Sequence, residues 1–286
     1  METIVVASLN GLVVGASLAL VAAGLALIFG VFDVLNLAQG DYFMFGAYGV
    51  WLVLDHGQNF WLGLAAAALV VGMAGGLLLL AMIWPLRGRP TALVLLATLG
   101  LSLILQQLAN NLFGGDTKAI HAPITAQLAI GTKQYPVYDL VIVLVAAAIL
   151  GGGFLFLRYA KYGIWIRAVA QNREMASVLG VPVSRVYVLA FMISSALAAL
   201  AGSLLVPLTG VYPTIGLDVT VNAFIVVIAG GLGNLRGAAV VALLLGVLES
   251  VGSIWVRAQA VQLTAFALVI LLLIVRSQRR NVLVRL

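Results

Sequence analysis

The chain has no cysteine and little charge: of its 286 residues, 8% are charged and 64% are hydrophobic. Without cysteine there is no disulfide, thiolate metal site or cysteine nucleophile. Soluble domains carry about 25% charged residues, so the composition excludes an ordinary water-exposed domain and indicates a lipid bilayer. The only histidines, His56 and His121, lie in segments that flank the apolar runs. We therefore expect no catalytic residue, no metal and no cofactor.

Lysine and arginine are absent before Arg87. A secretory signal begins with a basic stretch, so we expect the first apolar run to be a retained membrane span. The net charge of +6 is compatible with nucleic-acid binding. The basic residues are distributed over loops, however, and this distribution is better explained by the orientation of a membrane protein.

Nine runs are long and apolar enough to cross a bilayer, which takes about 20 residues. The fold class predicted is all-α: a polytopic transmembrane bundle of eight or nine spans, forming one domain over residues 1–286. The least certain run opens with polar residues and is a candidate re-entrant segment, and the glycine-interrupted stretch around 230–237 indicates a broken helix. The runs lie near 5–30, 33–54, 60–84, 91–113, 138–157, 186–207, 219–235, 237–256 and 260–276.

Basic residues in the loops predict the orientation, since cytoplasmic loops are enriched in lysine and arginine. Twelve of the fifteen fall in segments that this span count places on one side, and Lys118, Lys133 and Arg257 are left on the other. Nine spans put the N-terminus outside, and eight put it inside. The cytoplasmic set is Arg87, Arg89, Arg158, Lys161, Arg167, Arg173, Arg185, Arg236, Arg276, Arg279, Arg280 and Arg285.

Two segments share a pattern of apolar helix, polar glycine-containing break and small-residue helix. One runs from "LNGLVVGASLALVAAGLALIFG" to "NLAQGDYFMFGAYG", and the other is "VNAFIVVIAGGLGNLRGAAVVALLLG". Transporters often contain such repeats with broken helices at their interface, so an internal repeat is a hypothesis that the sequence raises.

The stretch 167–186, "RAVAQNREMASVLGVPVSRV", is the most polar part of the chain. Residues 172–179 fit a two-turn helix whose apolar face is formed by Met175, Val178 and Leu179 at i, i+3 and i+4. Gly180 stands at the position just past the helix, and Pro182 prevents its continuation. Such a helix either docks into a groove of a partner or lies on the membrane surface.

Glu174, Ala176 and Gly180 are spaced as in the E-A-A-x-x-x-G signature of ABC importer permeases, with Met175 in place of the first alanine. The stretch 167–186 followed by "FMISSALAALAG" resembles the branched-chain amino acid permease family of the Liv H type. The segments "GLALIFGVFDVLNLAQGDYFMFGAY" and "FIVVIAGGLGNLRGAAVVALLLGVLE" are similar to that family's terminal signatures. The resemblance covers nearly the whole chain, and its three segments occur in the expected order.

The resemblance implies an ABC importer in a bacterial inner membrane that carries branched-chain or related hydrophobic amino acids. Its implied partners are two ATPase subunits, a second related permease and an external binding protein. The chain has no Gly-x4-Gly-Lys-Ser/Thr motif to cradle ATP, which agrees with hydrolysis on separate subunits. A coupling loop over about 158–186 would then meet the ATPase through Arg173, Glu174, Met175, Ala176, Val178, Leu179 and Gly180.

A polar stripe follows the fourth apolar run, where polar residues recur every four positions and share one helix face. Polar groups in a bilayer must find partners. Two interpretations stay open: the stripe lines a hydrated translocation path, or it bonds this helix to another span. The stripe consists of Thr98, Ser102, Gln106 and Asn110.

Asn36, Gln39 and Asp41 lie in the polar opening of the second run. They are candidates for the translocation path, and capping the following helix is the other role open to Asp41.

Placing an acidic residue inside a membrane costs free energy, so a functional role is the default hypothesis for such a residue. Asp33, Asp41 and Glu249 would serve a self-sufficient secondary transporter, which is the first alternative to an ABC permease. The second alternative is an ABC permease of the same architecture that carries urea, short amides or a nucleoside. An intramembrane enzyme is disfavoured, because no catalytic arrangement of histidine, serine or paired aspartates occurs within the spans.

Overall fold

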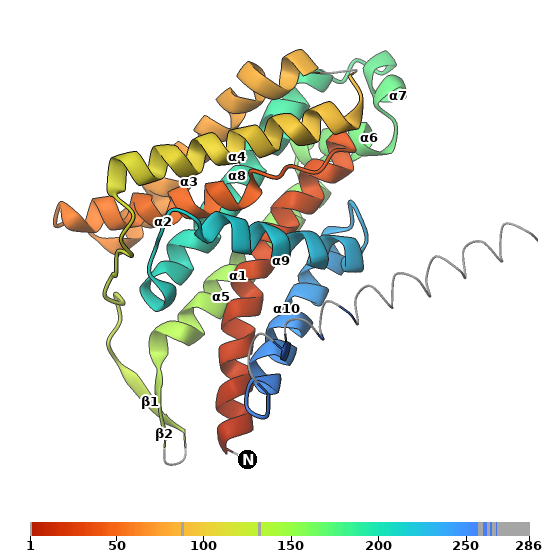
Figure 1. Cartoon of the computed structure of the whole chain (residues 1–286). Helices are drawn as coiled ribbons and strands as arrows, with labels where there is room; N and C mark the ends of the chain where they lie inside the picture. The colour runs from red at the N-terminus through yellow and green to blue at the C-terminus, as the bar shows by residue number, and fades with distance from the viewer. Residues whose placement is uncertain are drawn as a thin grey trace, which may run out of the picture.

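The computed structural model describes residues 2–86, 89–130 and 133–256, together with residues 260, 261, 264 and 267. Within these residues the protein is a bundle of ten α-helices with one small hairpin (Figure 1). The helices are α1 (Glu2–Phe32), α2 (Gln39–Asp55), α3 (Phe60–Leu78), α4 (Thr91–Phe113), α5 (Val137–Tyr159), α6 (Lys161–Gln171), α7 (Arg173–Val178), α8 (Val183–Thr209), α9 (Ile215–Gly230) and α10 (Leu235–Gly252).

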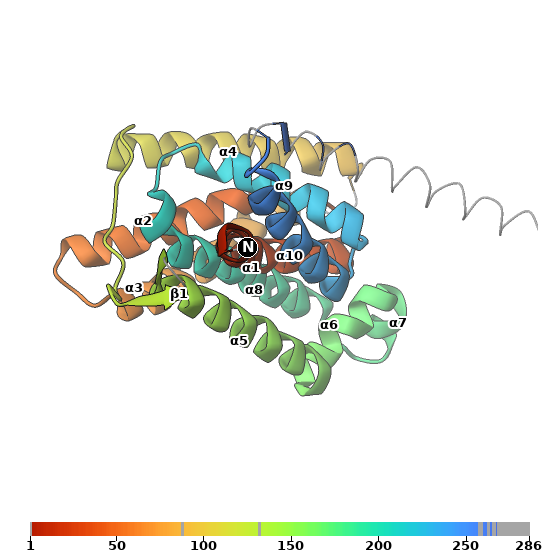
Figure 2. The same cartoon turned by 90° about the horizontal axis from the view of Figure 1, so that it is seen from below.

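Helix α1 is the centre of the bundle. Viewed along its axis, it is enclosed by other helices (Figure 2), and its residues from Gly15 to Ile28 are almost all buried. A helix that is apolar on every side is covered either by protein or by lipid, and α5 is as apolar as α1 yet far less buried. The central place of α1 therefore depends on its contacts with other helices, not on its composition alone.

Among the described residues, six helices are long and apolar enough to cross a membrane: α1, the Phe60–Leu86 segment, α4, α5, α8 and α10. Helices α2 and α9 are shorter, with 17 and 16 residues. The all-α, multi-pass class is confirmed, and the count of eight or nine crossings stays a prediction. The predicted run 260–276 and the basic tail that follows lie almost wholly outside the described residues.

The Phe60–Leu86 segment changes its winding near its end. A π-helical turn, η1 (Leu79–Ile83), follows α3 and leads into a 3-10 turn, η2 (Trp84–Leu86). Pro85 lacks a backbone N–H and is disfavoured inside an α-helix, which accounts for the tighter turn at this point.

Two helix breaks come together in space. The first separates α1 from α2, and the second, Gly231–Asn234, separates α9 from α10, as predicted around 230–237. A Cβ on Gly30 would lie 3.5 Å from the Cα of Gly233, so the last turn of α1, just before the first break, contacts the second break. Each proposed repeat segment is thus a helix, a break and a helix, while the repeat itself stays a hypothesis.

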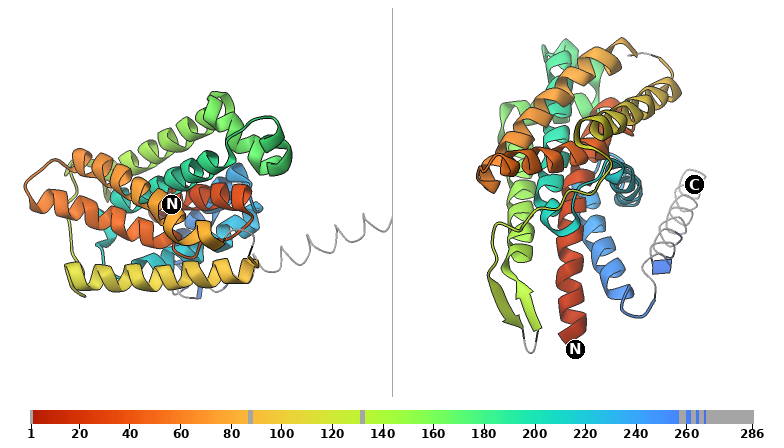
Figure 3. Two further views of the ribbon diagram at one scale, coloured as in Figure 1. Left: turned by 90° about the horizontal axis from the view of Figure 1, so that it is seen from above. Right: turned by 60° about the vertical axis from the view of Figure 1, so that its left-hand side comes forward.

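Basic loops and the hairpin lie at opposite ends of the bundle. Strands β1 (Gln127–Ile130) and β2 (Lys133–Pro136) pair antiparallel in the long loop before α5, and they lie at the same end as the N-terminus (Figure 3). Helices α6 and α7 are at the other end (Figure 1). The arrangement agrees with the predicted grouping of basic residues around 158–186 on one side. The hairpin is not foreseen by the sequence analysis.

Close glycine contacts hold α1 against α10. Gly11 meets Gly246 and Gly15 meets Ala242, so the helices run antiparallel with almost no space between their backbones. Small residues at helix crossings allow this approach in membranes, and van der Waals packing replaces the hydrophobic effect as the attractive force.

We predict that Gly15→Ala weakens the bundle. The added Cβ would lie 2.9 Å from the carbonyl oxygen of Ala242 and from the Cα of Leu243, and overpacking costs about 1–3 kcal/mol. Gly151→Ala is the matched control, because a Cβ there has no neighbour within 4 Å and the gain in helix propensity is the same. The unfolding midpoint in detergent should fall for Gly15→Ala only; equal midpoints would contradict the packing argument.

Candidate functional site

The break between α1 and α2 puts a helix start inside the bundle. Asp33 has a positive φ of 56° and ends α1, and α2 then begins at Gln39 with its first three residues buried. The cap residue of α2 is Ala38, which has no side-chain cap bond. The N-cap role considered for Asp41 is therefore wrong, since Asp41 lies in the first turn of α2 and contacts another helix.

Two threonines on distant helices supply the hydrogen bonds that the break needs. The backbone N–H of Leu37 donates to Oγ1 of Thr98 on α4 at 3.3 Å. The N–H of Gly40 donates to Oγ1 of Thr220 on α9 at 2.9 Å. An unpaired peptide group in a dry interior is costly, so these bonds stabilise the irregular backbone and tie α4 and α9 to it.

Gln39 is bonded to α8. Its Nε2 donates to the carbonyl oxygen of Ser194 at 3.3 Å and to the hydroxyl of Ser194 at 3.1 Å, and its side chain is completely buried. In this conformation Gln39 joins two helices. Its predicted place on a translocation path stays a prediction.

Most of the polar stripe faces the bundle. Gln106 donates from Nε2 to Oδ1 of Asp41 at 3.3 Å and to the hydroxyl of Ser102 at 2.9 Å. Both interactions lie in the buried interior, and Oδ2 of Asp41 has no hydrogen-bond partner among the described residues. Asn110, one turn further, is exposed. In this conformation the stripe bonds α4 to the break at Thr98 and to α2 at Gln106, whereas Asn110 does not join this network; the place of the stripe on a translocation path stays a prediction.

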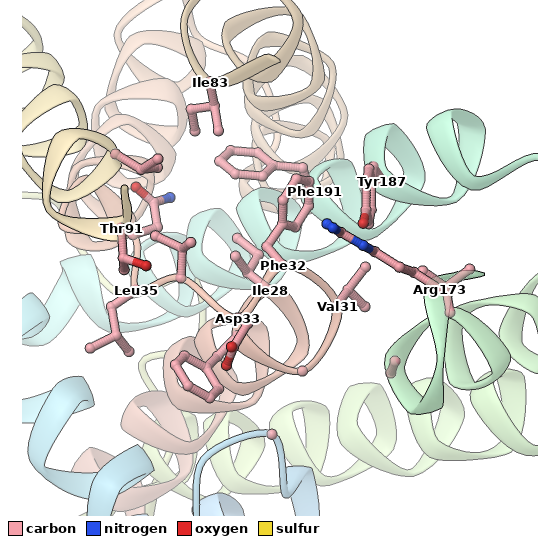
Figure 4. Close-up of a pocket in the computed structure, with 18 of the residues that line it drawn as sticks. Ile28, Val31, Phe32, Asp33, Leu35, Ile83, Thr91, Arg173, Tyr187 and Phe191 are labelled. Carbon is pink, nitrogen blue, oxygen red and sulfur yellow. The ribbon is translucent and has the colours of Figure 1, made fainter. Parts of the chain in front are cut away.

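A cavity of about 750 Å³ opens beside the break (Figure 4). Among the predicted path residues, Asn36 and Thr98 line it, while Gln39, Asp41, Ser102 and Gln106 do not. Its charged residues are Asp33, Arg89 and Arg173. The volume is in the range of small-molecule sites, and the lining comes from α1, the break, the η1–η2 turns, α4, α6, α7 and α8.

Aromatic side chains form one wall of this cavity. The rings of Phe32 and Tyr187 stack with centroids 4.3 Å apart, and Phe191 meets Phe32 edge to face at 6.2 Å. Trp84 packs against Tyr187 at 6.3 Å. The cavity thus offers an apolar wall on one side and polar or charged groups elsewhere, which suits a small amphiphilic solute.

The predicted short helix is present as α7. The side-chain oxygen of Asn172 accepts from the N–H of Met175 at 2.9 Å, which caps its start. Gly180 has the predicted left-handed conformation, with φ at 79°. The N–H groups of Gly180 and Val181 donate to the carbonyls of Ser177 and Ala176 at 3.0 Å, which is a Schellman ending.

The apolar face of α7 is not covered by any described part of the chain. Met175, Val178 and Leu179 are 57%, 81% and 75% exposed, whereas Ala176 is buried against the bundle. Arg173, the first residue of α7, instead extends into the cavity beside the break (Figure 4). The predicted coupling residues thus divide between an outward face and the cavity lining.

Some residues of this site could not be predicted from the sequence. Ser194 and Thr220 are single hydroxyl residues in apolar helices, and nothing in their spacing indicates that they meet the break. The aromatic wall combines residues from α1, η2 and α8, so only the tertiary structure assembles it. The polar opening of the second run and the polar stripe of the fourth run were the usable signals.

Family comparison agrees with this architecture. Residues 7–275 match the family model described as branched-chain amino acid transport system / permease component. The chain belongs to this family. The permease is 30% identical, over 284 residues, to the high-affinity branched-chain amino acid transport system permease protein LivH of Escherichia coli, with 93% of this chain and 91% of that protein covered.

A second relative gives the same result. The corresponding permease protein BraD of Pseudomonas aeruginosa is 30% identical over 282 residues, covering 93% of the permease and 92% of BraD. Among solved structures, PsaBC from Streptococcus pneumoniae in complex with Fab matches at 17% identity and a TM-score of 0.48, over 92% of the permease and 88% of that chain.

We predict that Gln106→Leu destabilises the permease by about 1–3 kcal/mol, because it removes the hydrogen bond that Gln106 donates to the buried carboxylate of Asp41. Replacing both partners, as in Gln106→Leu with Asp41→Leu, should recover much of this loss. Asn110→Leu is the control on the same helix and should have little effect. Thermal unfolding of the four variants in detergent measures the differences, and a double variant that is weaker than either single one would refute the pairing.

Proposed function

We propose that the permease is the membrane subunit of an ATP-driven importer in a bacterial inner membrane, and that its cargo is a branched-chain or related hydrophobic amino acid. Its partners in this proposal are two ATPase subunits, a second related permease and an external binding protein. Membership of the family and the names of LivH and BraD support the cargo class. The chain itself would perform no covalent chemistry.

The exposed apolar face of α7 is the observation that supports coupling to an ATPase subunit. A two-turn helix with a side-chain cap at one end and a Schellman ending at the other is held rigid, yet it exposes three large apolar side chains. An amphipathic helix of this kind buries its apolar face in a partner's groove. In the proposed complex, that groove belongs to an ATPase subunit and α7 is the coupling helix.

The cavity beside the break supports a role as the cytoplasmic part of the translocation path. It lies at the end of the bundle that carries the basic loop, and Arg173 brings α7 into its lining. The aromatic wall suits an aliphatic side chain, and Asn36 and Thr98 offer polar atoms at its inner side. In this proposal Gln39, Asp41, Ser102 and Gln106 lie next on the path and are rearranged when the solute passes.

Charge on the outward face of α7 should uncouple the transporter. We predict that Val178→Glu lowers ATP-dependent uptake at least tenfold, because a carboxylate cannot be buried in an apolar groove without a partner. The variant should still insert and purify, since residue 178 is exposed. Uptake into vesicles that contain all subunits, with loaded binding protein outside, provides the measurement.

Ser184→Glu is the matched control, because it adds the same charge at an exposed position beyond α7 and should keep near-normal uptake. Gly180→Pro, which destroys the left-handed ending, should resemble Val178→Glu. Normal uptake by both α7 variants would contradict the coupling role. Accumulation of solute by the permease alone on an ion gradient would instead support the secondary-transporter alternative.

Cargo is tested with the complete complex. Binding protein loaded with leucine, isoleucine or valine should stimulate the ATPase activity several-fold above unloaded protein. Urea, short amides and nucleosides, offered in the same way, should not. Stimulation by one of these solutes and by none of the amino acids would reject the proposed cargo while leaving the coupling proposal intact.

A further inference from the structure

A second pair of cavities lies between α1, α5 and α10, next to the cavity beside the break, with which the wider of the two shares Gly30, Val31, Ala170 and Gly233. One, of about 360 Å³, is lined by the ends of α1 and α5, by α6 and by the start of α10. The other, of about 200 Å³, continues from it along α1, α5, α8 and α10. Both are lined by Leu27, Phe154, Leu157, Leu235 and Arg236, so they form one continuous depression, called here the α5 groove.

Three arginines surround the wider end of the α5 groove. Arg158, Arg167 and Arg236 all line it. Nη2 of Arg167 donates to the backbone carbonyl of Arg158 at 3.0 Å, and the guanidinium carbon of Arg236 is 4.3 Å from the centre of the Phe154 ring. These contacts position the side chains of Arg167 and Arg236, while the guanidinium carbon of Arg158 lies 5.2 Å from the centre of the Tyr159 ring.

No acidic side chain lines this groove in the described part of the chain. None of the nine acidic residues lines either cavity, and in the described part of the chain no ion pair involves these arginines. Three like charges at one site repel one another, whereas a phosphate offers several oxygens to planar guanidinium groups. The wider end therefore has the chemistry of a phosphate site.

The narrow end of the α5 groove has the opposite character. Apart from Arg236, its lining is apolar, and it runs from Leu157 back to Ile149 on α5. At a rise of 1.5 Å per residue this is about 12 Å along the helix, which corresponds to a large part of one acyl chain. Gly153 lines this section, and a Cβ there has no neighbour within 4 Å.

We infer that the α5 groove binds one anionic phospholipid, with its phosphate between Arg158, Arg167 and Arg236 and one acyl chain along α5. Basic pockets between membrane helices on the cytoplasmic side bind anionic headgroups, and the apolar section distinguishes this site from a site for free phosphate. The inference does not depend on the cargo or on the coupling role of α7.

Native mass spectrometry of the complete transporter tests the inference. The complex, stripped of lipid in detergent, is offered phosphatidylglycerol, phosphatidylcholine or inorganic phosphate in separate arms. One phosphatidylglycerol per permease should stay bound, with at least tenfold higher occupancy than phosphatidylcholine. Inorganic phosphate should not displace it at millimolar concentration.

Matched variants distinguish the two ends of the groove. Gly153→Phe should remove the bound lipid by filling the apolar section, whereas Gly151→Phe should retain it, because residue 151 has equally open surroundings but lines neither cavity. Replacing the three arginines by glutamine should lower phosphatidylglycerol occupancy at least tenfold. Arg185→Gln, an exposed arginine outside the groove, should not.

Three results would overturn the inference. Equal retention of phosphatidylglycerol and phosphatidylcholine would remove the role of the arginines. Displacement of the lipid by phosphate, together with an unaffected Gly153→Phe variant, would indicate a site for free phosphate. A disulfide between Gly153→Cys and a cysteine placed on the second permease would show that protein fills the groove.

Discussion

Hydrogen bonding at the α1–α2 break is the constraint on which the bundle depends. A helix that starts inside the bundle has N–H groups that its own turns do not pair. The hydroxyls of Thr98 and Thr220 accept from Leu37 and Gly40, so α4 and α9 must lie on either side of the break. The buried place of α2 follows from this requirement as much as from its apolar side chains.

Glycines let the helices around the break pack closely against it. Gly40 on α2 meets Gly216 on α9, and Gly30 at the end of α1 meets Gly233 in the second break. Any side chain at Gly40 would collide with the backbone of Gly216, so these helices approach as closely as peptide groups allow. The two irregular segments thus support each other at the level of the cavity.

The regular part of the fold was predictable from the sequence because it follows from local properties. Apolar runs of sufficient length indicated α1, α3, α4, α5, α8 and α10, and the spacing of Met175, Val178 and Leu179 before Gly180 indicated α7 and its ending. A stop signal such as Gly180 acts within a few residues, so its consequence can be derived without the rest of the chain.

The candidate site was predictable only in part, because its geometry depends on contacts between distant residues. The polar stripe was recognised, but its periodicity of four was equally compatible with a path and with bonding to α2; the choice depends on Asp41, 65 positions away from Gln106. The pairing of Phe32 with Tyr187 and of Gln39 with Ser194 has no local signature. Hairpin β1–β2 was missed because its strands have four residues each, too few for a clear alternation.

Arg173 belongs at once to the first turn of α7 and to the lining of the cavity beside the break. Because α7 is only six residues long and closed at both ends, it has no internal joint that can absorb a displacement. If a partner moves α7, the backbone of Arg173 moves with it, and the lining of the cavity beside the break changes at the same time. A displacement of α7 then alters the cavity directly, without intermediate residues between the partner contact and the cavity lining.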